Sequence, residues 1–527
     1  MSDPWWRHAV CYQIYVRSFA DADGDGVGDI AGVTSRIPYL ADLGVDAVWL
    51  TPFYTSPQAD HGYDVADHRD VDPLFGALDD VDVMLAEAHR HDIRVIVDIV
   101  SNHSSAEHPW FRAALAAGPG SPERDLYIFR TGRGDGSEAP NNWQSIFGGP
   151  AWTRVADGEW YLHLFDRSQP DFNWENPAVG DEFESVLRFW LDRGVDGFRI
   201  DVAHGMFKAP GLPDLDVAAT DGGVESAMSE WDRPYWDQPG IHDVYRRWHR
   251  VLAEYDGDRM AIAEAWVATP AAMARYVRAD ELQQCFNFHW LDAEWSAAAF
   301  RRVLAETFAA VDPVAATPTW VLSNHDVTRT VTRYGDGAVG LARARAAMLA
   351  MLGLPGSAYI YAGEELGLPQ VDVAPEARQD PTWLRGGGVG RDGCRVPIPW
   401  SGDAPPYGFG PLAGQPWLPQ PDGFGGLNVE AQRADPDSTL NLVRAALRER
   451  HGLLASLPDR IDVLDRGADV LAYRRGPLSC VINCGSEPVE VADLGDPILA
   501  SARAAPAPDD PVGTRLPPDT AAWFPSR

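Results

Sequence analysis

The chain is poor in cysteine and almost devoid of lysine. Lys208 is the only lysine among its 44 Lys and Arg residues, a compositional bias from which we draw no function. The cysteines are odd in number, scattered and without a CxxC pair, which argues against a disulfide framework and against a cysteine-based zinc site. They are Cys11, Cys285, Cys394, Cys480 and Cys484.

Long apolar runs and a basic leader are missing as well. No stretch of about twenty apolar residues occurs, as a membrane-spanning helix requires, and the first residues lack the basic and apolar segments of a signal peptide. The net charge is −33, from 77 acidic and 44 basic residues. This charge argues against nucleic acid and anionic membranes as partners, since both bind positive surfaces. We therefore expect a cytoplasmic protein, and the sequence leaves its oligomeric state open.

The pattern of the chain predicts strands that alternate with helices. With 527 residues, 45% of them hydrophobic, the chain is long enough for two or three domains. Apolar β-branched segments alternate with amphipathic segments, which is typical of parallel βα units, and eight such units fit a closed (β/α)8 barrel. The expected strands are 10–19, 47–51, 94–103, 197–204, 260–266, 284–290, 319–326 and 357–361, and the clearest helices are 37–43, 79–91, 182–193 and 438–450.

Two regions depart from this alternation. Residues 104–167 are rich in Gly, Pro, Asn and Trp, and they predict a loop-rich excursion after the third strand, which leaves 1–103 and 168–455 for the barrel. Residues 456–527 contain short alternating strands and prolines, which indicates a small antiparallel β domain.

The fourth predicted strand carries charges that a strand interior seldom holds. Arg199 and Asp201 are two residues apart, so their side chains share one face of the strand. Two interpretations explain these charges. They form a buried structural ion pair, or the carboxylate is a nucleophile whose pKa is lowered by the neighbouring guanidinium. The strand alone does not separate these two interpretations.

Other predicted strands end in polar residues in the same way, and this favours an active site. In a (β/α)8 barrel the active site lies at the carboxyl ends of the strands. Unrelated structural charges would not be expected to fall so regularly at one rim. The rim residues are His103 after strand three, Arg199 and Asp201 on strand four, Glu264 on strand five, and His325 and Asp326 on strand seven.

Three carboxylates at one rim suit the cleavage of a glycosidic bond. One attacks the anomeric carbon, a second protonates the leaving oxygen, and a third orients and distorts the sugar. Two carboxyl groups about 5–5.5 Å apart give a covalent intermediate and retained configuration. Asp201 beside Arg199 is expected to stay ionised, and Glu264 between two alanines is expected to have a raised pKa.

An acidic loop follows the first strand. Asp21, Asp23, Asp25 and Asp29 alternate with small residues, and such a loop can wrap around a hard cation. The closing glutamate of an EF-hand is absent, so the loop is not an EF-hand. A polar, glycine-rich turn without an ion is the alternative. We expect Ca²⁺ or Mg²⁺ here in a structural role, with no cofactor for catalysis.

In combination, five motifs resemble the α-amylase superfamily of glycoside hydrolases, and within it the exo-acting α-glucosidase and oligo-1,6-glucosidase branch. The resemblance covers essentially the whole chain. It implies a barrel with an inserted domain at 104–167 and a C-terminal β-sandwich at 456–527. The motifs are Asp98–His103, Gln169–Trp174, Gly197–Asp201, Glu264–Trp266 and Ser323–Asp326.

The resemblance also implies roles for individual residues. Asp201 matches the nucleophile, Glu264 the acid/base and Asp326 the transition-state stabiliser. Asp60 and Arg391 match the pair that grips the non-reducing end of the sugar. The remaining expected substrate contacts are His103, Arg199, His325, Tyr63 as a stacking face, and Phe147, Phe165 and Gln169 as pocket-lining residues. The expected cation ligands are Asp21, Asp23, Asp25, the carbonyl of Val27, and Asp29.

The expected function is release of terminal α-linked glucose from maltose-like disaccharides and short oligosaccharides. The linkage stays open, because Val202 after the nucleophile is associated with α-1,6 preference, while the following Ala203-His204 resembles α-1,4-glucosidases. Trehalose synthase and sucrose-converting glucosyltransferases use the same scaffold and remain alternatives. A non-catalytic transporter subunit of this family is disfavoured, since those proteins lose catalytic carboxylates and carry a membrane helix.

Overall fold

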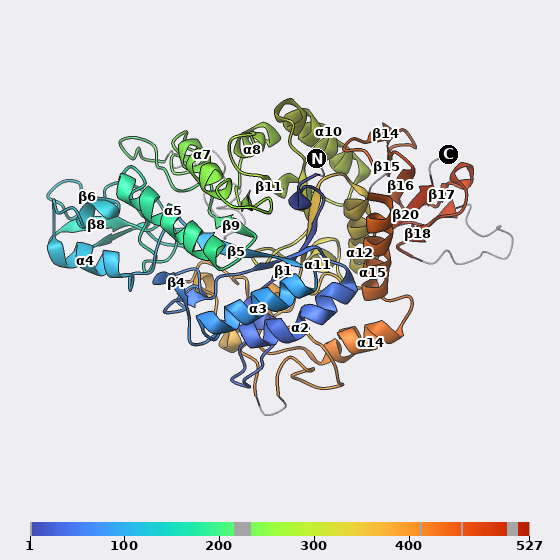
Figure 1. Ribbon diagram of the computed structural model, residues 1–527, viewed down its shortest axis with the longest axis horizontal. Coiled ribbons are helices and arrows are strands. Elements are labelled where there is room, and N and C mark those ends of the chain that lie inside the picture. The colour runs from blue at the N-terminus through green and yellow to red at the C-terminus, as the bar shows by residue number, and fades with distance from the viewer. Residues whose placement is uncertain (1–2, 216–232, 412–413, 455–456, 503–514, 526–527) are drawn as a thin grey trace.

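A closed barrel of eight parallel strands forms the centre of the protein (Figure 1). The computed structural model describes residues 3–215, 233–411, 414–454, 457–502 and 515–525. Around the barrel the strands follow the order β1-β13-β12-β11-β10-β9-β5-β2. The strands are β1 (Val10–Ile14), β2 (Ala47–Leu50), β5 (Arg94–Val100), β9 (Gly197–Asp201), β10 (Met260–Ala263), β11 (Gln284–Asn287), β12 (Thr319–Val321) and β13 (Ser357–Tyr361).

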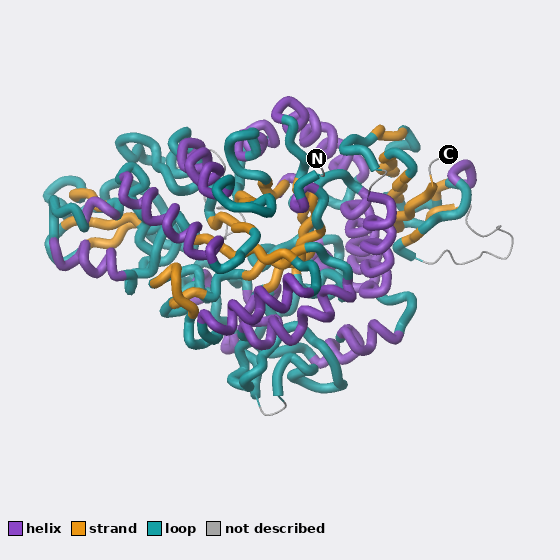
Figure 2. Tube along the Cα trace, in the orientation of Figure 1, coloured by secondary structure: helices purple, strands orange, loops and turns teal. Residues whose placement is uncertain are grey.

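The barrel strands are predominantly apolar because both of their faces are covered. Parallel strands in such a barrel pack against side chains inside and helices outside, so they do not alternate between apolar and polar residues. Figure 2 shows the helices around the strands. The larger helices are α2 (Ile30–Leu43), α3 (Leu78–Arg90), α5 (Pro177–Asp192), α7 (Ile241–Leu252), α8 (Pro270–Tyr276), α10 (Ala297–Val311), α12 (Gly337–Gly353), α14 (Val429–Ala434) and α15 (Thr439–Leu454). The predicted (β/α)8 fold is confirmed.

The first predicted strand is too long. Residues 10–19 were expected to be extended, but β1 ends at Ile14 and a short buried helix, α1 (Val16–Phe19), follows. The amide of Val16 donates to Oγ1 of Thr51 (3.2 Å), which ties the turn to the end of β2. Tertiary contacts of this kind override the β-propensity of the local sequence.

The register between neighbouring strands determines which charges meet inside the barrel. Residue 199 on β9 lies opposite residue 98 on β5 and opposite residue 262 on β10. Asp98 is the one acidic residue within β5, and it is completely buried. Arg199 therefore meets a carboxylate from the next strand as well as Asp201 on its own strand.

Two smaller β-regions lie at opposite ends of the view in Figure 1, one between β5 and β9 in the sequence and the other near the C-terminus. Between β5 and β9 the strands β6 (Phe129–Thr131), β8 (Glu159–Leu162) and β7 (Trp152–Arg154) form a sheet in that order, beside helix α4 (Pro109–Ala117). A two-stranded sheet, β3 (Tyr54–Thr55) and β4 (Asp67–Val71), precedes helix α3. The expected start of the last domain, Ser456, lies outside the described residues.

The C-terminal part of the chain forms antiparallel sheets beside helix α12. A five-stranded sheet has the order β14-β15-β16-β20-β18, and two further strands, β17 and β19, pair with each other. No helix within the described ranges has both the length and the apolar character to cross a bilayer. The C-terminal strands are β14 (Asp462–Leu464), β15 (Val470–Arg475), β16 (Leu478–Asn483), β17 (Val489–Glu490), β18 (Leu499–Ala500), β19 (Arg515–Leu516) and β20 (Thr520–Pro525).

Two side chains of this sheet attach it to helix α12. The hydroxyl of Tyr473 donates to the carbonyl of Ala350 (2.6 Å), and the indole of Trp523 donates to the carbonyl of Leu349 (3.0 Å). Both side chains are fully buried. A Cβ at Gly353 would lie 2.4 Å from the Tyr473 hydroxyl, so the helix approaches closely only because this residue is a glycine.

We predict that Trp523→Ala lowers the free energy of unfolding by about 3–5 kcal/mol, because it leaves a large cavity in this contact. Trp523→Phe keeps most of the apolar volume and should cost clearly less. Urea denaturation monitored by circular dichroism measures both. A cost for Trp523→Ala within about 0.5 kcal/mol of zero, as for surface substitutions, would contradict this role.

Candidate active site

The carboxyl ends of the barrel strands surround one pocket. The empty space among its lining residues, open solvent included, is about 410 Å³. Ten of the twelve predicted catalytic and substrate-binding residues line it, and Ile146 and Val202 line it in addition. The ten are Asp60, Tyr63, His103, Phe147, Phe165, Asp201, Glu264, His325, Asp326 and Arg391.

Arg199 lies behind the pocket and contacts three carboxylates at once. Its Nη1 is 2.6 Å from Asp201 Oδ1 and 2.9 Å from Asp98 Oδ1, and its Nη2 is 3.2 Å from Glu264 Oε2. The guanidinium is 2% exposed and no carboxylate of the three exceeds 8%. One positive charge therefore faces three buried acidic groups, and it cannot keep all of them ionised.

The protonation of these groups follows from burial and from this shared cation. Burial raises the pKa of Glu264 to about 8 and the pKa of Asp98 to about 7, against the opposing effect of Arg199. Burial also raises the pKa of Asp201 above its ordinary value. Arg199 lowers the pKa of Asp201 as expected, but burial outweighs it, so the expectation of a pKa below the ordinary value is wrong. The expected raised pKa of Glu264 agrees with the structure.

Two hydrogen bonds fix the orientation of the Glu264 carboxyl group. The indole of Trp266 donates to Oε1 (2.8 Å), and the amide of Val202 donates to Oε2 (2.7 Å). The Trp266 ring stacks on Phe288 with ring centroids 4.0 Å apart. Val202 has a positive φ of 45°, a strained conformation for a β-branched residue, and it turns its amide toward the glutamate.

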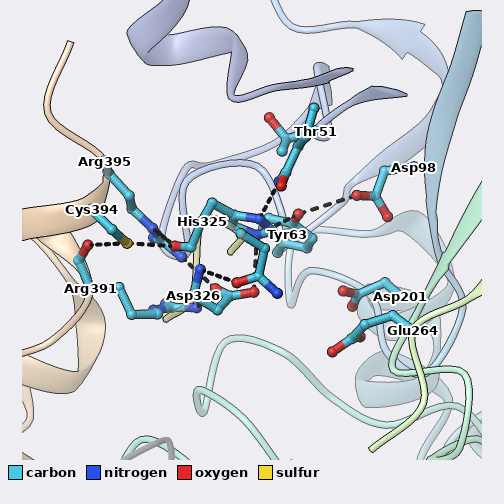
Figure 3. A network of polar contacts seen from close by, with 12 residues as sticks. Thr51, Tyr63, Asp98, Asp201, Glu264, His325, Asp326, Arg391, Cys394 and Arg395 are labelled. Carbon is cyan, nitrogen blue, oxygen red and sulfur yellow. Dashed lines mark hydrogen bonds and ion pairs between the residues drawn. The ribbon is translucent and has the colours of Figure 1, made fainter. Parts of the chain in front are cut away.

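Asp326 lies across the pocket from Asp201 and Glu264 (Figure 3). Its Oδ1 accepts hydrogen bonds from Arg391 (3.0 Å) and Arg395 (2.8 Å). Burial opposes ionisation of Asp326, but the charges of His325, Arg391 and Arg395 outweigh it and hold its pKa well below the ordinary value. Asp326 is therefore the carboxylate of the site that is ionised at every physiological pH.

Arg391 connects Asp326 to the opposite wall of the pocket. It donates to Asp60 through Nη2 (2.8 Å) and to Asp380 through Nε (2.6 Å). Asp380 is fully buried and also accepts from the amide of Thr382 (2.8 Å). Burial raises the pKa of Asp60 to about 7, although Arg391 acts against this rise.

Gln169 and His103 form the wall beside Asp60. The amide of Gln169 donates to Asp60 Oδ2 (3.1 Å), and its nitrogen lies 3.2 Å from Nε2 of His103. The Phe165 ring packs on His103 and on Phe147, with ring centroids 5.1 Å and 5.7 Å apart. Gln169 and Arg199 thus hold lining residues from behind, and they are the two predicted residues that do not line the pocket themselves.

Tyr63 packs on His325 inside the site. The two rings are parallel within 7°, with centroids 5.3 Å apart, and the Tyr63 hydroxyl is 2.8 Å from Nε2 of His325. The other ring nitrogen, Nδ1, is 2.6 Å from the amide nitrogen of Gln13. The His325 ring thus occupies one face of Tyr63, which restricts how this side chain can stack on a ligand.

The acidic loop brings three of its four aspartates together. Carboxylate oxygens of Asp21, Asp23 and Asp29 all lie within 4.8 Å of one another. Asp25 stands outside this group, and its Oδ1 accepts from the amide of Val27 (2.8 Å). An all-oxygen donor set of this kind fits a hard divalent cation.

Several residues around the site were not predicted. Asp98 forms an ion pair with Arg199, and Asp380 forms one with Arg391. Arg395 is the second arginine that contacts Asp326. The four-residue spacing of Arg391 and Arg395 was visible in the sequence, but it carried no signal that both face one carboxylate. Ile146 lines the pocket as an apolar residue for which the sequence offers no signal beyond its closeness to Phe147, and Val202, named above only for linkage preference, lines the pocket as well.

Comparison with known proteins agrees with this geometry. The alpha amylase catalytic domain family matches residues 13–456. The oligo-1,6-glucosidase of Parageobacillus thermoglucosidasius is 37% identical, over 86% of this chain and 85% of that protein. A probable alpha-glucosidase of Rhizobium meliloti is 36% identical, over 92% of this chain and 90% of that protein. The crystal structure of an alpha-glucosyl transfer enzyme, XgtA, superposes with a TM-score of 0.88 at 35% identity and covers both chains completely.

The fold and the rim of carboxylates define a barrel glycosidase. The chain is a member of the alpha-amylase family of glycoside hydrolases.

The pKa values predict a bell-shaped pH dependence of kcat/KM. A mechanism that needs Glu264 protonated loses activity as the pH rises through about 8. A mechanism that needs Asp201 ionised loses activity as the pH falls toward the raised pKa of Asp201. The assay is hydrolysis of an aryl α-glucoside between about pH 4 and 10, the span that brackets both limbs.

Two variants test which residue gives rise to each limb of the pH profile. Glu264→Gln should lose the alkaline limb, and a leaving group that needs little protonation should restore much of its first chemical step. Asp201→Asn should lose several orders of magnitude with every leaving group. Equal restoration of both variants, or an alkaline limb that persists in Glu264→Gln, would contradict the assignment.

Proposed function

We propose that the protein is a retaining exo-α-glucosidase that releases terminal, non-reducing α-linked glucose from maltose-like disaccharides and short oligosaccharides. The observation that carries this proposal is the pair Asp60 and Arg391, joined at 2.8 Å on one wall of the pocket. Both side chains are at most 9% exposed. A buried carboxylate and guanidinium are suited to bind the hydroxyls of one terminal sugar and to block a longer chain beyond it.

In the proposed first step, an oxygen of Asp201 forms a bond to the anomeric carbon while the glycosidic bond breaks. Glu264 gives its proton to the leaving oxygen, so the departing sugar is neutral and the glutamate becomes a carboxylate. In the second step Glu264 takes a proton from water, whose oxygen replaces Asp201 on the anomeric carbon. Two inversions give net retention of the α configuration.

The ionised Asp326 supports this chemistry without forming a bond. The transition state carries positive charge on the anomeric carbon and the ring oxygen, and a fixed carboxylate stabilises such charge without reorganisation. Arg391 and Arg395 hold Asp326 ionised and in place. We propose that His103, His325 and the aromatic walls surround the same glucosyl unit.

Transfer to a second sugar is the alternative fate of the covalent intermediate. The likeness to an alpha-glucosyl transfer enzyme supports transglucosylation as an accompanying activity. Preference for α-1,6 linkages, and trehalose synthase or sucrose-converting activity, remain alternatives on the same scaffold. Product analysis on maltose, isomaltose, trehalose and sucrose separates them, since hydrolysis yields free glucose and transfer yields new disaccharides.

The proposal predicts the first products from maltopentaose. A pocket closed by Asp60 and Arg391 admits one glucosyl unit, so glucose and maltotetraose should appear first, with the α-anomer of glucose formed initially. Asp60→Ala should lower kcat/KM by about 30- to 1,000-fold, because it leaves buried hydrogen-bonding groups unpaired. Asp60→Asn keeps the shape and one acceptor and is the matched control, expected to lose less.

Maltose and maltotriose as the first products would contradict this proposal. They would come from an internal bond and would indicate a cleft that is open at both ends. An Asp60→Ala variant with unchanged kcat/KM would reduce the pair to a structural ion pair.

We also propose that Asp21, Asp23 and Asp29 hold Ca²⁺ or Mg²⁺ in a structural role. Their clustered oxygens support this proposal, and the family resemblance adds Asp25 and the Val27 carbonyl. EDTA should then lower the melting temperature and leave initial rates at low temperature nearly unchanged. Asp23→Asn should remove the effect of EDTA. Elemental analysis without bound metal, together with an unchanged melting temperature, would show that the loop is only a turn.

The cytoplasmic location stays a prediction.

A further inference from the structure

The only lysine of the chain is buried and contacts Asn102, the neighbour of the pocket residue His103. Lys208 follows strand β9, and its side chain is 3% exposed. Its Nζ is 2.7 Å from Asp171 Oδ2 and 2.9 Å from Asn102 Oδ1, and it also donates to the carbonyl of Gly205. These three acceptors use all three protons of the ammonium group.

An arginine does not fit this place, although arginine supplies every other basic charge of the 44 Lys and Arg residues. A guanidinium is planar and spreads five donors in a fork, whereas here three acceptors converge on one atom. Three acceptors that converge on one atom therefore match a compact ammonium better than a guanidinium.

Lys208 and Asp171 together orient the side-chain amide of Asn102. The ammonium only donates, so it requires the amide oxygen on its side. The carboxylate of Asp171, paired with Lys208, accepts hydrogen bonds and so requires the amide nitrogen, which lies 3.2 Å away. A rotated amide would place its NH₂ group against a cation and its oxygen against an anion.

The oriented amide in turn faces His103. The Asn102 amide nitrogen is 3.2 Å from Nδ1 of His103, so Nδ1 accepts and carries no proton. Burial lowers the pKa of His103, which keeps the ring neutral near pH 7 and leaves two possible tautomers. With Nδ1 unprotonated, the proton must reside on Nε2.

The surroundings of Nε2 do not decide the tautomer by themselves. Nε2 is 3.2 Å from an acceptor, the carbonyl of Tyr63, and 3.2 Å from a donor, the amide nitrogen of Gln169. The Gln169 amide is itself held by Asp60 and by the backbone amide of Asp166. The contact between the Asn102 amide and Nδ1 therefore decides which tautomer of His103 forms.

We propose that Lys208 is a positioning residue that fixes His103 as the Nε2–H tautomer by orienting the amide of Asn102. His103 lines the pocket, so this tautomer presents an N–H donor to a hydroxyl oxygen of the bound sugar. This last step rests on the proposed function, whereas the tautomer itself is a property of the protein without substrate.

The test is ¹⁵N NMR of protein labelled at histidine, without ligand and at neutral pH. The His103 signals are assigned by their disappearance in His103→Gln. In the unsubstituted protein Nδ1 should resonate as an unprotonated nitrogen and Nε2 as a protonated one. In Asn102→Asp, which keeps the lysine and places a carboxylate oxygen against the ring, Nδ1 should become protonated.

A second variant removes both orienting charges. Lys208→Met combined with Asp171→Asn leaves no unpaired buried charge, and the freed amide should allow Nδ1 to be protonated in part of the molecules. The kcat/KM on maltose should fall about tenfold or more in both variants, as expected for the loss of one hydrogen bond to a substrate hydroxyl.

Arg124→Met is the matched control. Arg124 is also buried and paired, with Asp157 (2.6 Å) and Glu159 (3.0 Å), but it contacts none of the pocket residues. It should lower stability and leave the His103 signals unchanged.

Either of two results would overturn the proposal: a proton on Nδ1 in the unsubstituted protein, or an unprotonated Nδ1 in both variants. A protein with the expected tautomers that cleaves no α-glucoside would refute the proposed function and leave the role of Lys208 intact.

Discussion

The active site depends on one buried guanidinium that serves three carboxylates. Arg199 approaches Asp98, Asp201 and Glu264 within 3.2 Å, and none of the four side chains is more than 8% exposed. If each acid had its own cation, all three would be ionised, and no general acid would exist near neutral pH. Because the charge is shared, it does not offset the burial that raises the pKa of Glu264 to about 8, while Asp201 retains the shortest contact to Arg199.

A second buried arginine repeats this arrangement on the other side of the pocket. Arg391 contacts Asp60, Asp326 and Asp380, but here Arg395 adds a second positive charge. Together with His325 and Arg391, this additional cation holds the pKa of Asp326 well below its ordinary value, whereas burial raises the pKa of Glu264. Glu264 and Asp326 thus differ in protonation because burial dominates at Glu264, whereas neighbouring positive charges outweigh burial at Asp326.

The sequence predicted the barrel and the residues at its rim because both depend on local patterns. A polar residue at the end of an apolar strand is visible along the chain, and the carboxyl ends of parallel strands meet at one edge. Ten predicted residues therefore line one pocket.

The sharing of Arg199 was beyond sequence reasoning, since Asp98 and Glu264 reach it from neighbouring strands whose register no local pattern encodes. The predicted pKa direction of Asp201 failed because burial in the folded barrel outweighs the effect of Arg199. The predicted end of strand β1 was wrong for a related reason. Thr51, which lies far along the chain, accepts a hydrogen bond from the amide of Val16 at the turn. Lys208 was dismissed as compositional bias, although its partners Asn102 and Asp171 lie 106 and 37 positions earlier.

The central claim is that Arg199 leaves Glu264 protonated and Asp201 ionised in the same resting site. Neutron diffraction from crystals of the unliganded protein, exchanged into D₂O near neutral pH, observes this directly. The account predicts a deuteron on the Glu264 carboxyl group and none on either oxygen of Asp201. A deuteron on Asp201, or a Glu264 without one, would contradict it.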